Sequence, residues 1–309
     1  MSERRRRSDS PPVGTRSSSS HHAASTGAGV SIRVIKVGGR AQADPRLATA
    51  IATAAERPGA RIVVVHGGGD EVSAMQRRLG LEPSFIGGRR VTSAADLTVV
   101  RMVLSGTVNK RIAAQLCDAG APAVGISGED GGLLSADVDV DGEMGRVGRD
   151  VFADASLVAH LLNGGWVPVI SPLARERVVK RGQQNPEGTP PFAFDADRGT
   201  VDLGGTLNVN GDDAAAAIAA GLGADELLFV ADVPGVLEEG TLLRSLDVDA
   251  ARALCDRGIA RDGMRAKLEA AASALRNGVR AVRIAALEGI ANRADGTAIT
   301  PKPVTRERT

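Results

Sequence analysis

The sequence predicts an α/β protein with a largely parallel central sheet. From Ser31 onward, short runs of Val, Ile and Leu alternate with segments of helical periodicity. This alternation is typical of parallel strands joined by helices, and it disfavours a sandwich of antiparallel sheets. The chain has 309 residues, which is enough for one large α/β domain or for two lobes that share a continuous sheet.

Six segments have the composition of buried strands. Each is short, mostly apolar and bounded by turn residues, which is the pattern of a strand covered on both faces. The predicted strands are Ser31–Val37, 61–66, 123–126, Val167–Ser171, 226–231 and 280–285.

Helical segments fill the intervals between these strands. Asp44 and Pro45 form an N-cap and first-turn pair for the first helix, and the Pro-Gly pair at 58–59 ends it. The predicted helices are 44–56, 70–79, 94–104, 108–118, 155–162, 212–220, 250–257 and 264–276.

Two stretches of the chain do not follow the alternation of strands and helices. Residues 175–203 contain prolines and charges without a sustained period, so we predict a long surface loop or hairpin insertion. A connecting segment at 173–207 would then separate an N-terminal lobe, 30–172, from a C-terminal lobe, 208–309. Residues 1–29 are rich in Arg and Ser without an apolar signal-peptide core, and we predict a disordered tail. The arginine run at 4–7 also fits a polyanion-binding arm.

The amino-acid composition limits the classes of molecule that the protein could bind. Aromatic residues make up only 2% of the chain, which leaves little for base stacking, and 38 Lys and Arg balance 37 Asp and Glu. We therefore expect a small-molecule partner and no nucleic acid. No apolar run reaches the ~20 residues that span a bilayer, and Cys117 and Cys255 lack disulfide or zinc spacing. These features predict a cytoplasmic protein without membrane contact.

Two glycine-rich turns follow predicted strands. The first strand ends in Lys36 and is followed by Gly38 and Gly39, where main-chain N–H groups can approach an anion. The second ends in His66 and runs through three glycines, 67–69, into a helix whose N-terminus favours anions. The first turn alone also fits a solvated turn. The second matches neither the P-loop nor the dinucleotide-binding pattern.

Three later segments add to this pattern. Residues 208–212, Asn-Val-Asn-Gly-Asp, precede an Ala-rich helix, which either Asn210 or Asp212 would cap. Residues 232–236, Asp-Val-Pro-Gly-Val, follow an apolar strand, as glycine turns do at adenine nucleotide sites. Residues 263–267 open a helix and place Lys267 in its first turn. Each segment alone also fits an ordinary cap, turn or surface lysine.

These segments lie between Val34 and Lys267. Taken together, and in their order along the chain, they closely resemble the motifs of the amino-acid kinase family. Within it, GGRRVT at 87–92, GTVNK at 106–110 and AVGISGEDGGLL at 123–134 are most similar to the acetylglutamate kinases. The resemblance implies a three-layer αβα sandwich of the carbamate kinase-like type. It places the acyl-amino-acid substrate and a dimer contact in the N-terminal lobe and ATP in the C-terminal lobe.

The activity that the resemblance implies is phosphorylation of the γ-carboxylate of N-acetyl-L-glutamate by ATP, in arginine biosynthesis. Lys36 would stabilise the transferring phosphoryl group, Lys267 would do so from the nucleotide side, and Asp212 would hold both lysines. Magnesium would arrive on the ATP phosphates, without a protein metal site. Because a γ-carboxylate is ionised at neutral pH, no general base is needed, and we expect His66 to be structural.

The resemblance also assigns binding residues. The α-carboxylate of the substrate would be clamped by Arg90, with the adjacent Arg89 as the alternative, because a guanidinium can bind it through two parallel hydrogen bonds. The remaining substrate-binding and phosphate-binding residues would be Gly68, Gly69, Asn208, Gly38 and Gly39. The wall around the adenine and ribose would be Asp232, Val233, Pro234, Gly235, Val236, Leu237, Ile259, Ala260 and Arg261.

Departures from the family pattern leave alternatives open. Arg265 and Ala266 replace the usual residues of GM-[IV]-P-K, and the basic Arg265 resembles kinases of acylated or carrier-linked 2-aminoadipate, in lysine biosynthesis. The insertion at 175–203 lies just before Asn208 and could reshape the acyl pocket, so N-succinylglutamate is a further alternative substrate. A catalytically silent amino-acid sensor would have no need of the paired lysines. Residues 1–29 lack the apolar stripe of the N-terminal helix that links arginine-sensitive members into hexamers, and 295–299 departs from their Gly-x-Gly-Thr ending. We therefore expect a homodimer with little inhibition by arginine.

Overall fold

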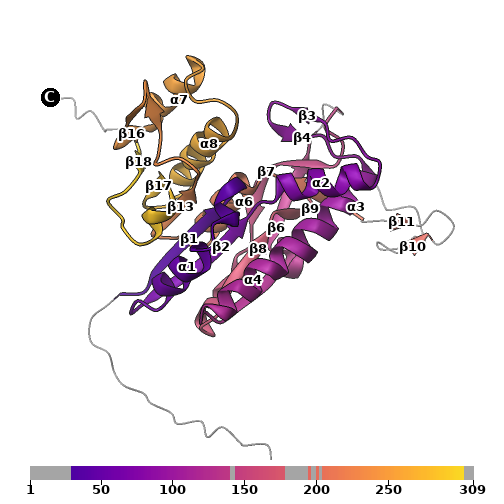
Figure 1. The fold of residues 1–309 in the computed structure, drawn as a ribbon, viewed down its shortest axis with the longest axis horizontal. Coiled ribbons are helices and arrows are strands. Elements are labelled where there is room, and N and C mark those ends of the chain that lie inside the picture. Colours follow the sequence, from indigo (N-terminus) through magenta and orange to yellow (C-terminus); the bar gives the residue numbers. More distant parts are fainter. Residues whose placement is uncertain (1–28, 140–142, 178–193, 196–199, 202–203, 303–309) are drawn as a thin grey trace, which may run out of the picture.

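An eight-stranded sheet forms the centre of the protein (Figure 1). The computed structural model describes residues 29–139, 143–177, 194–195, 200–201 and 204–302, so the predicted tail at 1–29 lies outside the described residues except for Gly29. The strand order is β16-β18-β17-β13-β1-β2-β8-β5, and only β17 and β18 pair antiparallel. The strands are β1 Ser31–Val37, β2 Ala60–His66, β5 Ala123–Ser127, β8 Val167–Ser171, β13 Glu226–Val230, β16 Ser245–Asp247, β17 Val282–Ala285 and β18 Thr297–Thr300.

All six predicted strands are present, with ends that differ by two residues or fewer. The two strands that were not predicted, β16 and β18, lie together beyond β17 at one side of the sheet. β18 is short and partly polar, so its sequence lacks the continuous apolar run that identifies a strand buried on both faces.

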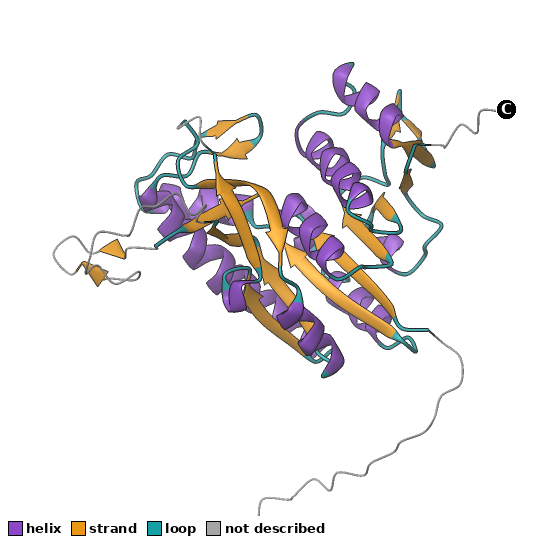
Figure 2. Ribbon diagram, turned by 180° about the vertical axis from the view of Figure 1, so that it is seen from behind, coloured by secondary structure: helices purple, strands orange, loops and turns teal. Residues whose placement is uncertain are grey.

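Helices cover both faces of the sheet, which confirms the predicted three-layer αβα sandwich (Figure 2). Successive side chains of β1 point to opposite faces of the sheet. Val34 belongs to the apolar core that includes α5 to α8, whereas Ile35 belongs to the core that includes α1 to α4. The helices are α1 Leu47–Ala55, α2 Gly69–Arg78, α3 Ala94–Arg101, α4 Asn109–Asp118, α5 Ser156–Asn163, α6 Gly211–Gly221, α7 Val248–Asp256 and α8 Asp262–Arg276. Short 3-10 helices are η1 Gly39–Ala43, η3 Asp130–Gly132 and η4 Leu287–Ile290.

Two helix predictions were wrong at their boundaries. The first helix begins at Leu47 and not at Asp44, whose carboxylate instead accepts the backbone N–H of Arg46 at 2.9 Å in the turn after η1. The predicted gap after 104 is absent, because the π-helix η2, Met102–Val108, joins α3 to α4. Ser105 and Gly106 are weak helix formers, but the wider π-helical turn accommodates them.

A small closed barrel, which was not predicted from the sequence, lies beside the sheet. Its strands are β6 Leu134–Val138, β7 Val147–Ala153, β9 Leu173–Glu176 and β12 Thr206–Val209. β9 and β12 pair antiparallel, so both ends of the predicted 173–207 connecting segment are strands and not loop. Between them the structure describes the short pair β10 Phe194–Asp195 and β11 Thr200–Val201 together with Arg177, Gly204 and Gly205, whereas 178–193, 196–199 and 202–203 lie outside the described residues. Two further hairpins are β3 Phe85–Ile86 with β4 Arg89–Arg90, and β14 Leu237–Glu238 with β15 Thr241–Leu242.

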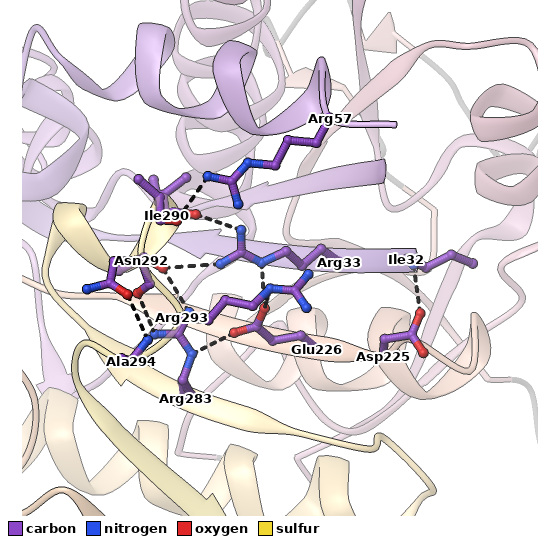
Figure 3. Close-up of polar contacts among 12 residues, drawn as sticks. Ile32, Arg33, Arg57, Asp225, Glu226, Arg283, Ile290, Asn292, Arg293 and Ala294 are labelled. Atoms are coloured by element: carbon purple, nitrogen blue, oxygen red, sulfur yellow. Dashed lines mark hydrogen bonds and ion pairs between the residues drawn. The ribbon is translucent and has the colours of Figure 1, made fainter. Parts of the chain in front are cut away.

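A buried ion cluster joins the strands of the two halves of the chain (Figure 3). Glu226 on β13 accepts hydrogen bonds of 2.6 Å from Arg33 on β1 and of 2.6 Å from Arg283 on β17. Both guanidinium groups also donate to the carbonyl of Gly289 in η4. The cluster therefore ties β1, β13, β17 and η4 together.

Candidate active site

One cavity of about 860 Å³ gathers most of the residues that the sequence analysis singled out. It opens where β1 and β2 end in their glycine turns and where β12 runs into α6. Carboxyl ends of parallel strands are the usual place for a ligand in an α/β sheet. The predicted residues that line the cavity are Lys36, Gly38, Gly39, Gly68, Gly69, Arg89, Arg90, Asn208, Asp212, Ala260, Arg261 and Lys267.

Three charged side chains meet in this cavity. Nζ of Lys36 lies 2.7 Å from Oδ1 of Asp212, and Nζ of Lys267 lies 3.4 Å from Oδ2. The Asp212 side chain is only 5% exposed. Burial alone would raise the pKa of Asp212, but the two ammonium groups outweigh burial and hold that pKa below its usual value. Burial, together with repulsion from Lys36, lowers the pKa of Lys267.

The start of α6 leaves the carboxylate of Asp212 available to these lysines. Of the two candidate caps, the structure selects Asn210, whose Oδ1 accepts the backbone N–H of Asp212 at 2.7 Å. Lys36 folds back over the turn after β1, so a Cβ on Gly38 would lie only 2.5 Å from Nζ of Lys36. A side chain at position 38 would therefore displace the ammonium group.

The second glycine turn brings the N-terminus of α2 to the cavity. Gly68 has a φ of 155°, and a Cβ there would lie 2.8 Å from Cδ2 of Leu104 in the π-helix η2. Only glycine allows this close approach. The first residues of α2 consequently line the same cavity as Lys36, and a helix N-terminus there favours an anion.

Arg90 and Arg89 point to different places. The guanidinium of Arg90 is buried against α2, where it donates to the carbonyl of Gly69 and to Oγ of Ser73, both at 2.8 Å. Arg89 instead pairs with Asp213 on α6, with Nη2 3.1 Å from Oδ2. The β3–β4 hairpin is thus held at α2 by one arginine and at α6 by the other.

Asn208 and His66 have well-defined partners. Asn208 lines the cavity from β12 and donates to Oγ1 of Thr92 at 3.0 Å. His66 is fully buried, with Nδ1 2.8 Å from the carbonyl oxygen of Gly67 and Nε2 3.1 Å from Nδ2 of Asn109. Burial lowers the pKa of His66 to about 4, so the ring is neutral at pH 7. This environment is that of a structural histidine.

The predicted nucleotide residues are only partly gathered at the cavity. Ala260 and Arg261 line it, whereas 232–237 and Ile259 do not. The carboxylate of Asp232 partly offsets the lowering of the Lys267 pKa that burial and Lys36 cause. Val236 is buried, and its backbone N–H donates to Oγ1 of Thr297 at 2.8 Å. In the described part of the chain, no group of three or more His, Cys, Asp or Glu side chains could enclose a metal ion.

The partners of the two arginines were not predicted from the sequence. Asp213, Ser73 and Gln76 lie in α6 and α2, and only the folded chain places them beside the β3–β4 hairpin. Burial raises the pKa of Asp213 to about 6 despite the charge of Arg89. No sequence pattern could have indicated the Arg89–Asp213 pair, because 124 positions separate the two residues.

A family model for the amino acid kinase family matches residues 31–286. The chain belongs to this family. Among its curated relatives, the acetylglutamate kinase of Chloroflexus aurantiacus is 38% identical over 262 residues, covering 84% of this chain and 94% of that protein. The acetylglutamate kinase of Roseiflexus castenholzii is 41% identical over 261 residues, covering 83% and 90%. These matches confirm the family resemblance that the motifs had indicated.

Solved structures show the same fold. A crystal structure of a Streptococcus mutans protein superposes with a TM-score of 0.69 at 27% identity, covering 88% of this chain and 99% of that one. The N-acetylglutamate synthase of Neisseria gonorrhoeae, solved with coenzyme A and N-acetylglutamate, gives 0.68 at 25% identity, covering 89% and 60%. The carbamate kinase of Giardia gives 0.60 at 15% identity, which supports the fold alone. Among the described residues, no helix has the length and apolarity to cross a membrane.

Proposed function

We propose that this amino acid kinase phosphorylates the γ-carboxylate of N-acetyl-L-glutamate with ATP, as a step of arginine biosynthesis. The observation that carries the proposal is the buried cluster of Lys36, Asp212 and Lys267 in one cavity with Arg90. The substrate is proposed from the curated relatives, which are acetylglutamate kinases.

The charge of the cavity suits two anionic substrates. Its lining contains six cationic side chains, Lys36, Arg89, Arg90, Arg261, Arg265 and Lys267, and four carboxylates, Asp70, Asp212, Asp262 and Glu269. The resulting excess of two positive charges, six minus four, would reduce repulsion between ATP and a dicarboxylate. In phosphoryl transfer, such preorganised charge provides most of the catalysis.

Each lysine would stabilise the transferring phosphoryl group from one side. Lys36 would act from the side of the acyl-amino acid and Lys267 from that of the nucleotide, while Asp212 keeps both ammonium groups in place. The turn at Gly38 and Gly39 would add backbone N–H donors to the phosphoryl oxygens. The acceptor carboxylate, with an ordinary pKa of about 4.3, attacks without a general base.

The acyl-amino acid would lie between α2 and the barrel. Arg90 would bind its α-carboxylate, Gly68 and Gly69 would contact it through their backbone, and Asn208 would hydrogen-bond it from β12. ATP would lie toward Ala260 and Arg261, with 232–237 and Ile259 completing the wall around adenine and ribose. Magnesium would be held mainly by the nucleotide phosphates, where it would neutralise part of their charge.

A second substrate class has one observation in its favour. Arg265 lines the cavity at the position where the family pattern has an apolar residue, and its Nε is 2.8 Å from Oε1 of Glu269. A basic residue there resembles the pattern of kinases that act on carrier-linked 2-aminoadipate. N-succinylglutamate is the other alternative acceptor, and a silent sensor is the alternative without catalysis.

The deciding experiment is an ATP-dependent hydroxylamine trapping assay of the acyl phosphate. The acceptors would be N-acetylglutamate, N-succinylglutamate and N-acetylaminoadipate at matched concentrations, with and without magnesium. We expect the highest kcat/KM with N-acetylglutamate and no product without magnesium. Preference for another acceptor would overturn the substrate, and no turnover with any acceptor would favour the sensor.

Assembly and location complete the proposal. We propose a cytoplasmic homodimer joined through the N-terminal lobes, since two-fold dimers are the commonest symmetric assembly. Light scattering of the full chain and of a variant that lacks residues 1–29 should give the same dimeric mass. A hexamer that dissociates on truncation would contradict this.

A further inference from the structure

The guanidinium of Arg90 donates a hydrogen bond to the buried side chain of Gln76. We propose that Gln76 is a positioning residue that orients the guanidinium of Arg90 toward the cavity while leaving its charge uncompensated until a carboxylate binds. The inference rests on the proposed function, in which Arg90 binds the α-carboxylate of the substrate. It assigns a role in substrate affinity to two residues, Gln76 and Asp96, that do not line the cavity.

The Arg90 guanidinium makes its hydrogen bonds to neutral groups. Nη2 donates to the carbonyl of Gly69 and to Oγ of Ser73, each at 2.8 Å, and Nη1 donates to Oε1 of Gln76. The aromatic ring of Phe85 lies over the guanidinium, 4.7 Å from its carbon to the ring centre. These contacts fix the plane of the group at the wall of the cavity.

Gln76 links this arginine to a carboxylate in the next helix. The glutamine is 1% exposed, and its Nε2 donates to Oδ1 of Asp96 at 2.6 Å. Asp96 is itself held by the capping box of α3, where Oδ2 accepts the backbone N–H and the Oγ–H of Ser93 at 3.0 and 2.7 Å. The partners fix the amide orientation, because the oxygen must face the donor on Arg90 and the nitrogen must face the acceptor on Asp96.

We call the hydrogen bonds that run from Arg90 through Gln76 to Asp96 the relay. They orient the guanidinium but place no charged group against it. Among the described residues, no carboxylate lies within the 4.0 Å of an ion pair with Arg90. A glutamate at position 76 would place a negative charge directly on the guanidinium, whereas the glutamine keeps the charge of Asp96 one residue away. A buried cation without a counterion gains more from a ligand carboxylate than one that is already paired.

A double variant tests the position of the charge alone. Combining Gln76→Glu with Asp96→Asn moves the negative charge next to Arg90 while the net charge of the three residues is unchanged. Every hydrogen bond of the relay has a counterpart, because the new amide at position 96 would donate to the new carboxylate at position 76, and its oxygen would accept from Ser93. Steady-state kinetics on the trapping assay would be measured for both substrates, with circular dichroism and thermal unfolding as controls of folding.

We expect the double variant to raise the KM for the acyl-amino acid about tenfold or more, with kcat and the KM for ATP within about twofold of wild type. Unchanged KM for the acyl-amino acid in a folded double variant would overturn the inference. Equal losses in both KM values would do the same, because they would indicate a general structural role.

A second variant covers the case in which the double variant does not fold. Gln76→Met removes both hydrogen bonds at similar length and adds no charge, so it should raise the KM for the acyl-amino acid severalfold through loss of orientation. A wild-type KM in this variant would also overturn the inference. A wild-type enzyme that turns over no acceptor would refute the proposed function and this inference together, whereas an active wild type with unaffected variants refutes the inference alone.

Discussion

Lys36 and Lys267 share one carboxylate, and this contact predicts that both lysines are needed for turnover. Replacing either lysine by alanine should lower kcat by about 10²-fold or more, which is typical for loss of one preorganised charge-stabilising group. Lys302→Ala is the matched control, because that lysine is 70% exposed and pairs with Asp249 at the surface. Near-normal turnover in Lys36→Ala or Lys267→Ala would remove that residue from the proposed mechanism.

Arg90 and Arg89 differ in their surroundings, and this difference predicts different consequences of the same substitution. Arg90→Lys should raise the KM for the acyl-amino acid by about an order of magnitude or more, because one ammonium group cannot replace a two-pronged contact. The KM for ATP should stay nearly unchanged. Arg89→Lys is the control, since a lysine can still pair with Asp213. If Arg89→Lys had the larger effect, the assignment of the carboxylate ligand would be reversed.

At the scale of single elements, the start of α6 contains both the residue that caps the helix and the carboxylate that contacts the two lysines. Asn210 caps the helix, and two positions later Asp212 binds the lysines. Asn210→Ala should lower the free energy of unfolding by about 1 kcal/mol, as is usual when a cap is lost, whereas Asn210→Ser should retain most of it. Urea unfolding of the three proteins measures the effect. Equal stability of all three would show that α6 does not depend on its cap.

The elements also show where sequence patterns fail. Five of the six predicted strands are largely buried and β5, at the edge of the sheet, is half-buried, but all six are mostly apolar, so composition alone locates them. The barrel strands were missed because three of them have only four or five residues and because charged residues interrupt their apolar runs, as Asp137 does in β6, Arg175 in β9, and Arg149 and Asp150 in the longer β7. The break predicted after 104 failed for another reason: η2 packs against Gly68, and that tertiary contact outweighs the weak helix propensity of Ser105 and Gly106.

At the scale of the whole molecule, the cluster around Glu226 ties β1, from the N-terminal part of the chain, to β13 and β17 from the C-terminal part. Glu226→Ala would leave Arg33 and Arg283 buried without a counterion, which should cost about 3–5 kcal/mol of stability. Asp249→Ala breaks an exposed ion pair with Lys302 and should barely change stability. Chemical unfolding compares the two. A small effect of Glu226→Ala would mean that the carbonyl groups of η4 suffice to hold the arginines.

The free energy of unfolding should also depend on pH, because the pKa values of two buried groups, His66 and Asp213, are shifted in the folded protein. The folded-state pKa of His66 is lowered from 6.5 to about 4, so its contribution is complete above pH 6.5 and is lost as pH falls toward 4. The folded-state pKa of Asp213 is raised from 3.8 to about 6, so its contribution is present at low pH and is lost as pH rises toward 6. The two dependences oppose each other between about pH 4 and 6.

Asp213→Asn removes one of these dependences and should expose the other. The variant should lose stability more steeply than wild type between about pH 6.5 and 4.5, by up to about 3 kcal/mol from His66. Urea unfolding at several pH values is the measurement. Parallel curves for the two proteins would show that Asp213 titrates normally in the folded state.

The local sequence is sufficient to locate six of the eight strands of the central sheet, most of their covering helices and the family, because apolar runs and glycine turns at strand ends are local features. It also names the charged residues of the cavity, since Lys36, Asp212 and Lys267 each stand next to such a turn or helix start. Which groups touch one another depends instead on the folded chain. That Asn210 caps α6, that Arg89 turns to α6 and that Gln76 stands between Arg90 and Asp96 became visible only there. The last two contacts join distant segments and depend on how layers and strands pack, and no local pattern encodes that packing.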